Sequence, residues 1–169
     1  GCKKMENGFI TALTAVQNSS VIAAITSFNG HTARYGLSLS PLQAMELVET
    51  RASALIRTGR IEFGTGILEK LIAAFCDSPY ILQRNYAETL SELLETFYYF
   101  KNETYDTVSD DELIALMKYS FDNTCQGSVD LLQSRELENL AHNIRFETGN
   151  LSCAEPGDDI DTQEVYEDE

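Results

Sequence analysis

The sequence lacks tryptophan altogether and contains only two histidines among 169 residues. It also lacks a long hydrophobic run, because its longest uninterrupted apolar stretches are residues 71–76 and 21–25. A helix that crosses a bilayer needs about 20 consecutive apolar residues. We therefore expect no membrane-spanning segment.

The shortage of histidine limits the catalytic sites that the chain can form. His31 follows an Asn-Gly pair at the end of a predicted helix, and His142 lies on the last predicted helix. Neither belongs to a recognised catalytic motif, and the chain contains no Gly-x-Ser-x-Gly, phosphate-binding or dinucleotide-binding pattern. The sequence thus indicates no catalytic residue and argues against an enzyme without excluding one.

Cysteine is also scarce and scattered. The four cysteines, Cys2, Cys76, Cys125 and Cys153, form no Cys-x-x-Cys motif. A secreted disulfide framework would be denser, and a zinc site would show more regular ligand spacing. We interpret these residues as reduced thiols of a cytoplasmic protein, and we expect no bound metal or cofactor.

Basic residues are few: 12 lysines and arginines stand against 27 acids, which gives a net charge of −15. The segment 147–169 alone holds nine acids and no base. No basic patch that would neutralise phosphates is visible, so nucleic acids and anionic membranes are not expected partners.

The chain does contain helical periodicity, and the most regular stretch is residues 78–101. Ser78 followed by Pro79 is typical of a helix start. Large apolar residues then recur at spacings of four and three, at Tyr86, Leu90, Leu93, Phe97 and Phe100. This stripe predicts one long helix that neighbouring helices cover.

Further helices are predicted over residues 5–17, 21–34, 41–58, 67–75, 110–121 and 134–144. Ser40-Pro41 and the Ser109–Glu112 capping box mark two of their starts. No convincing strand accompanies them. We expect an all-α fold, an irregular antiparallel bundle of five to seven helices over residues 1–146. Residues 147–169 are expected to form an acidic tail that is disordered or docked.

Two adjacent tyrosines on the long helix, Tyr98 and Tyr99, are candidates for a binding surface. They lie between Phe97 and Phe100, and a helix cannot bury four consecutive aromatic residues against one neighbour. At least one tyrosine is therefore exposed at an interface or covered by a loop.

The segment from Asp122 to Gln133 has the layout of a degenerate EF-hand loop, with Gly127 at its sixth position. Only Asp122 and Asp130 are carboxylates, and Gln133 stands where a bidentate glutamate belongs. We interpret the segment as a helix–turn–helix connection rather than a calcium site.

The polar face of the long helix carries Glu88, Glu92 and Glu95 one turn apart. Such carboxylates form di-metal sites when a facing helix supplies Glu-x-x-His, and the chain has no such motif. We interpret them as a solvated face.

Four segments stand out: residues 59–64 (GRIEFG), 75–81 (FCDSPYI), 97–103 (FYYFKNE) and 109–114 (SDDELI). Through them the chain resembles an uncharacterised bacterial family that is catalogued only as a domain of unknown function, over roughly residues 20–144. The resemblance implies a cytoplasmic bacterial protein and supplies no site residues. Arg60 and Glu62 are the polar residues of the first segment; we interpret them as an ion pair that fixes a helix connection, with a binding role as the alternative.

Together these patterns favour a cytoplasmic helical module that binds another protein, through the long helix or the acidic tail. Self-association is left open. The alternative is a regulator or enzyme that binds a small molecule or metal in an interhelical pocket, with Arg60 and Glu62 among its polar groups.

Overall fold

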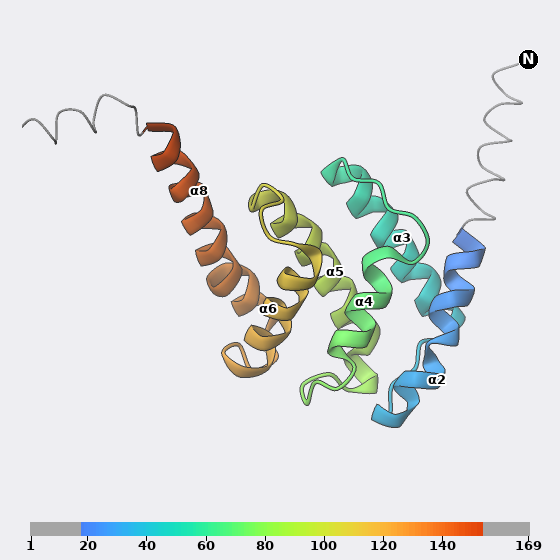
Figure 1. The fold of residues 1–169 in the computed structure, drawn as a ribbon. Helices are drawn as coiled ribbons and strands as arrows, with labels where there is room; N and C mark the ends of the chain where they lie inside the picture. Colours follow the sequence, from blue (N-terminus) through green and yellow to red (C-terminus); the bar gives the residue numbers. More distant parts are fainter. Residues whose placement is uncertain (1–17, 154–169) are drawn as a thin grey trace, which may run out of the picture.

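The computed structural model describes the backbone of residues 18–153 and the side chains of residues 18–147. Within that range the chain is helical and contains no strand, so the predicted all-α class is confirmed (Figure 1). The predicted helix over residues 5–17 and the acidic residues 154–169 lie outside the described residues. No helix of the described part is both long enough and apolar enough to cross a membrane.

The principal helices are α3 (Pro41–Thr58), α4 (Gly66–Phe75), α5 (Tyr86–Glu103), α6 (Asp110–Asn123) and α8 (Glu138–Cys153). Residues 18–27 are also helical, and α2 (Asn29–Thr32) with a 3₁₀ turn (Ala33–Tyr35) follows them. From α3 to α6, successive helices run in alternating directions (Figure 1). This arrangement is the irregular antiparallel bundle that the sequence predicts.

Helix α5 is the centre of the bundle, because it packs against α3, α4, α6 and α8. Its buried face includes Leu90, Leu93, Phe97 and Phe100, each at most 3% exposed, as the apolar spacing predicts. Helices α3 and α5 run in the same direction and pack along their length: Arg57 near the end of α3 pairs with Glu95 in the second half of α5.

The predicted start of the long helix at Ser78 is wrong. The chain forms turns and a 3₁₀ segment (Gln83–Asn85) before α5 begins at Tyr86. The Ser78 hydroxyl does not cap a helix; it is buried and donates a hydrogen bond to Asp122 Oδ1 at 2.6 Å. A tertiary contact 44 residues away thus outweighs the local capping preference of Ser-Pro.

The other two capping predictions are confirmed. Ser40 and Ser109 each accept a hydrogen bond from the backbone N–H three residues later, and the side chain at that position returns the bond. Helix α3 ends at Gly59, whose φ of 70° is the left-handed conformation that favours glycine.

After α6 the chain turns at Gly127 and enters α7 (Val129–Leu131), a π-helical segment (Leu132–Leu137) and α8 without a break. The predicted helix over residues 134–144 is therefore the middle of a longer one. It extends to Cys153, past the expected start of the tail at 147, so the division between helical domain and tail stays a prediction.

An open groove along helix α5

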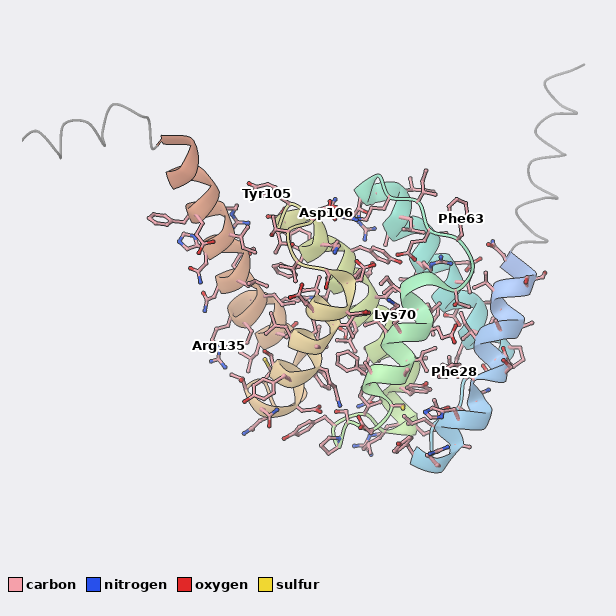
Figure 2. The ribbon with its side chains drawn as sticks, viewed as in Figure 1. Phe28, Phe63, Lys70, Tyr105, Asp106 and Arg135 are labelled. Carbon is pink, nitrogen blue, oxygen red and sulfur yellow. The ribbon has the colours of Figure 1, made fainter. Side chains whose placement is uncertain are left out.

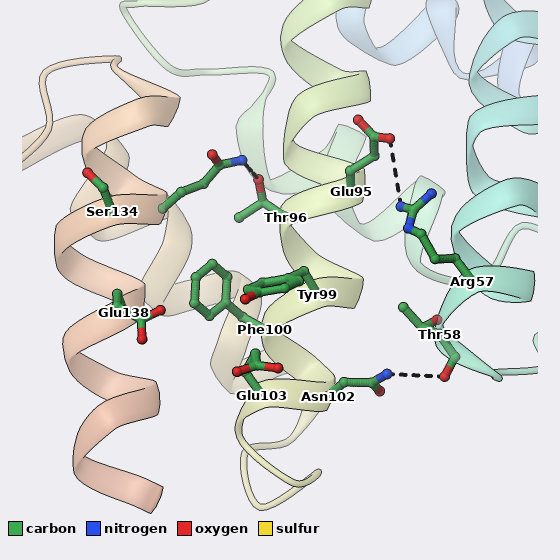
Figure 3. A pocket seen from close by; sticks show the side chains of 11 residues that line it. Arg57, Thr58, Glu95, Thr96, Tyr99, Phe100, Asn102, Glu103, Ser134 and Glu138 are labelled. Atoms are coloured by element: carbon green, nitrogen blue, oxygen red, sulfur yellow. Dashed lines mark hydrogen bonds and ion pairs between the residues drawn. The ribbon is translucent and has the colours of Figure 1, made fainter.

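A groove with a volume of about 700 Å³ lies along α5, between the end of α3 and the start of α8 (Figure 3). Its floor includes Thr96, Tyr99 and Phe100 of α5. Tyr99 is 52% exposed, and its ring meets the edge of the Phe100 ring with centroids 4.9 Å apart. Tyr99 is therefore an accessible aromatic surface held in place by a buried neighbour.

One wall of the groove is the end of α3. Asn102 of α5 donates a hydrogen bond from Nδ2 to the carbonyl oxygen of Thr58 at 3.1 Å. Arg57 lies 3.7 Å from Glu95, with both side chains about half exposed. The Asn102 bond fixes the spacing between this wall and the floor, whereas the exposed Arg57–Glu95 pair contributes little.

The opposite wall is the π-helical segment and the first turn of α8 (Figure 3). Gln133 donates from Nε2 to Thr96 Oγ1 at 2.6 Å, and Thr96 donates onward to the Glu92 carbonyl oxygen at 2.7 Å. A π-helical turn widens the helix, and such turns occur often at functional sites. Here the widened turn includes two of the wall residues, Gln133 and Ser134.

The groove is acidic. Glu95, Glu103 and Glu138 line it together with a single cation, Arg57. Arg145 bridges Glu103 and Glu138 at 2.8 and 2.6 Å from outside the lining. The carboxylates therefore outnumber the cations even when Arg145 is included.

The two adjacent tyrosines have different environments. The sequence predicts that at least one of them is exposed or covered by a loop, and Tyr99 is the exposed one. Tyr98 is fully buried, and its hydroxyl lies beside Glu62 and Arg51 without a hydrogen bond to any described residue. Burial, with Glu62 as the next cause, raises its pKa above the ordinary tyrosine value. Tyr98 is a core residue, and only Tyr99 is available to a partner.

Arg60 and Glu62 do not pair with each other, and the expectation of one ion pair between them is wrong. Arg60 donates to Asn102 Oδ1 at 2.8 Å and pairs with Asp106 on the loop after α5. Glu62 accepts from Arg51 Nε at 3.0 Å and from the Ile67 N–H at 3.2 Å, at the start of α4. Each one still fixes the connection between α3 and α4, through a separate partner.

The outward residues of this connection are apolar. Ile61 is 82% exposed and Phe63 is 88% exposed, and Figure 2 shows Phe63 projecting away from the helices. The side chains alternate inward and outward because the inward members, Arg60 and Glu62, are held by ion pairs. Neither Arg60 nor Glu62 lines the groove along α5.

The side chains of the EF-hand-like segment do not converge. Asp122 accepts from Ser78 and pairs with Lys118 at 3.1 Å, whereas Gln133 donates to Thr96. Among the described residues, no three histidine, cysteine or acidic side chains form a group that could hold a metal ion. Cys76 and Cys125 are both free and buried.

Sequence reasoning missed Glu103, Gln133 and the Arg145 bridge as parts of this surface. Glu103 could have been found, because Glu88, Glu92, Glu95, Tyr99 and Glu103 recur at spacings of four, three, four and four. Gln133 and Arg145 come from a helix whose packing against α5 no local pattern specifies.

The fold and the groove define a helical-bundle protein with an open acidic surface along its central helix. The chain belongs to a family described as a family of unknown function (DUF6323), whose model matches residues 24–150. Comparisons with curated proteins and with solved structures gave no match. The predicted resemblance to a domain of unknown function is thereby confirmed, and the function must be argued from the groove.

Proposed function

We propose that this protein is a helical interaction module that binds a segment of another protein in the groove along α5. The observation that carries the proposal is Tyr99, an aromatic residue half exposed on the floor of a groove between α3 and the π-helical wall. Partly exposed tyrosines are enriched at binding interfaces, because the ring buries apolar area while its hydroxyl stays hydrated.

The shape of the groove supports a polypeptide rather than an enclosed small ligand. It is partly open to solvent and bounded by helices on both sides (Figure 3). Grooves between helices commonly receive an amphipathic helix, whose apolar residues contact the floor. The polar candidates for an enclosed site, Arg60 and Glu62, do not line this groove, and each is bound to another side chain.

Site-specific photo-crosslinking tests the proposal. A photoreactive phenylalanine analogue is placed at Tyr99 of the full chain, and as a control at Tyr119, which is 65% exposed on α6. A partner should crosslink at position 99 and not at position 119. The identified partner, purified, should then bind Tyr99→Ala at least about tenfold more weakly than the wild type. Equal crosslinking at both positions, or unchanged affinity, would contradict the proposal.

A further inference from the structure

The exposed side of α5 carries one continuous row of residues: Glu88, Glu92, Glu95, Tyr99 and Glu103. We call this row the α5 stripe. Its members are exposed or half-buried, whereas the residues on the opposite side of the helix form the core. At 1.5 Å per residue the stripe is about 22 Å long, which matches a docked helix of about 15 residues.

Two surface depressions share this floor. The groove described above contains Glu95, Tyr99 and Glu103, and a second, smaller one contains Glu88 beside Glu46 and Arg84. The second depression lies between α3 and the first half of α5, and the groove lies along the second half of α5, so the two follow one another along this helix. A partner segment lying along α5 would therefore meet the whole stripe.

The charge of the stripe is only partly compensated. Arg57 pairs with Glu95 and Arg145 with Glu103, at 3.7 and 2.8 Å. Within the part of the chain that the structure describes, neither Glu88 nor Glu92 has a cation within 4 Å. The first half of the α5 stripe thus carries like charges without a paired cation among the described residues.

Glu92 shows the effect of this crowding. It is faced by Glu88 and Glu95 from α5 and by Asp130 from α7. Partial burial and these three like charges raise the pKa of its carboxyl group above the ordinary value. A bound cation would relieve the repulsion among the four carboxylates.

From this arrangement we infer that the partner segment is basic and amphipathic: its lysine or arginine side chains neutralise the α5 stripe while one of them or an apolar residue covers Tyr99. The inference rests on the proposed function and names the chemistry of the partner. Charge complementarity of this kind favours fast association and rejects acidic segments. A cation over the exposed face of Tyr99 gains a further cation–π attraction.

The test uses the full chain and a fluorescent peptide of about 15 residues, built from leucine and lysine so that the lysines follow one helical face. A matched peptide carries glutamate in place of lysine. Fluorescence anisotropy should detect binding of the lysine peptide and none of the glutamate peptide. The double variant Glu92→Gln/Glu95→Gln should bind the lysine peptide about fivefold more weakly.

The control is Glu49→Gln/Glu69→Gln, which removes two exposed charges from α3 and α4 outside the stripe. Both double variants keep the eight acids of residues 154–169, so unspecific attraction to that segment is the same. Affinity should stay unchanged in the control. Equal weakening in the two variants, or no binding of the lysine peptide, would overturn the inference.

The pH dependence gives a second readout. Because the pKa of Glu92 is raised, this carboxylate becomes protonated at a higher pH than an ordinary one as the pH falls. Binding of the lysine peptide should therefore begin to weaken at a higher pH in the wild type than in the Glu92→Gln variant. Identical pH profiles would count against the stripe as the binding surface.

The two proposals fail in different ways. A partner that crosslinks at position 99 through an acidic or neutral segment would overturn the basic chemistry and leave the interaction module intact. The absence of any crosslink at position 99 would overturn both.

Discussion

Gly66 is the residue on which the buried polar cluster of the bundle depends. Its φ of +52° lies in the left-handed region, and a Cβ atom built there would lie 2.1 Å from Glu62 Oε1 and 2.8 Å from Arg51 Nη2. Arg51 is only 6% exposed, so its charge requires the Glu62 carboxylate nearby. The absence of a side chain at Gly66 thus makes room for this ion pair.

We expect Gly66→Ala to destabilise the protein by about 3 kcal/mol, since it adds backbone strain and displaces a buried ion pair. Gly64→Ala is the matched control, because Gly64 also has a positive φ of 61° but no atom within 4 Å of the added Cβ. The control should lose only about 1 kcal/mol. Urea unfolding followed by circular dichroism measures both; equal losses would show that the ion pair needs no such space.

At the scale of elements, a candidate capping residue caps a helix only where its side chain has no competing contact. Ser109 is exposed, and it forms the reciprocal capping box with Glu112. Ser78 is buried, and its hydroxyl goes to Asp122. Thr65 precedes α4 but makes no capping bond to the backbone; its hydroxyl donates to Glu69 at 2.7 Å. Composition around the three residues does not reveal which one caps.

This difference predicts unequal effects of removing the hydroxyl groups. Ser109→Ala should lower the free energy of unfolding by about 1 kcal/mol, because the first turn of α6 loses its cap. Thr65→Ala should change it by less than about 0.5 kcal/mol, since only an exposed side-chain bond is lost. Thermal and urea unfolding of the two variants measure these losses. A larger loss of stability for Thr65→Ala than for Ser109→Ala would contradict the assignment of caps.

At the scale of the whole molecule, the helical class, the central position of the long helix and its buried face follow from apolar spacing alone. The same spacing predicts that at least one of the adjacent tyrosines, Tyr98 and Tyr99, is exposed or covered by a loop, but it does not distinguish them; the structure shows that Tyr99 is the exposed one. The ion-pair partners of Arg60 and Glu62 cannot be predicted from apolar spacing. Arg60, for example, pairs with Asp106, which is 46 residues away on a loop that comes near only in the packed bundle. The groove is likewise a product of packing, because its two walls come from α3 and from the α7–α8 side.

The central claim is that the exposed side of α5 is the binding surface of this protein. Amide chemical-shift mapping of the isotope-labelled full chain, titrated with the lysine–leucine peptide, tests it most directly. The account predicts that the largest shift changes fall between Glu88 and Glu103 and on the wall from Gln133 to Glu138. Changes confined to another face, such as the surface around Lys70 and Asp111, with Tyr99 unaffected, would contradict it.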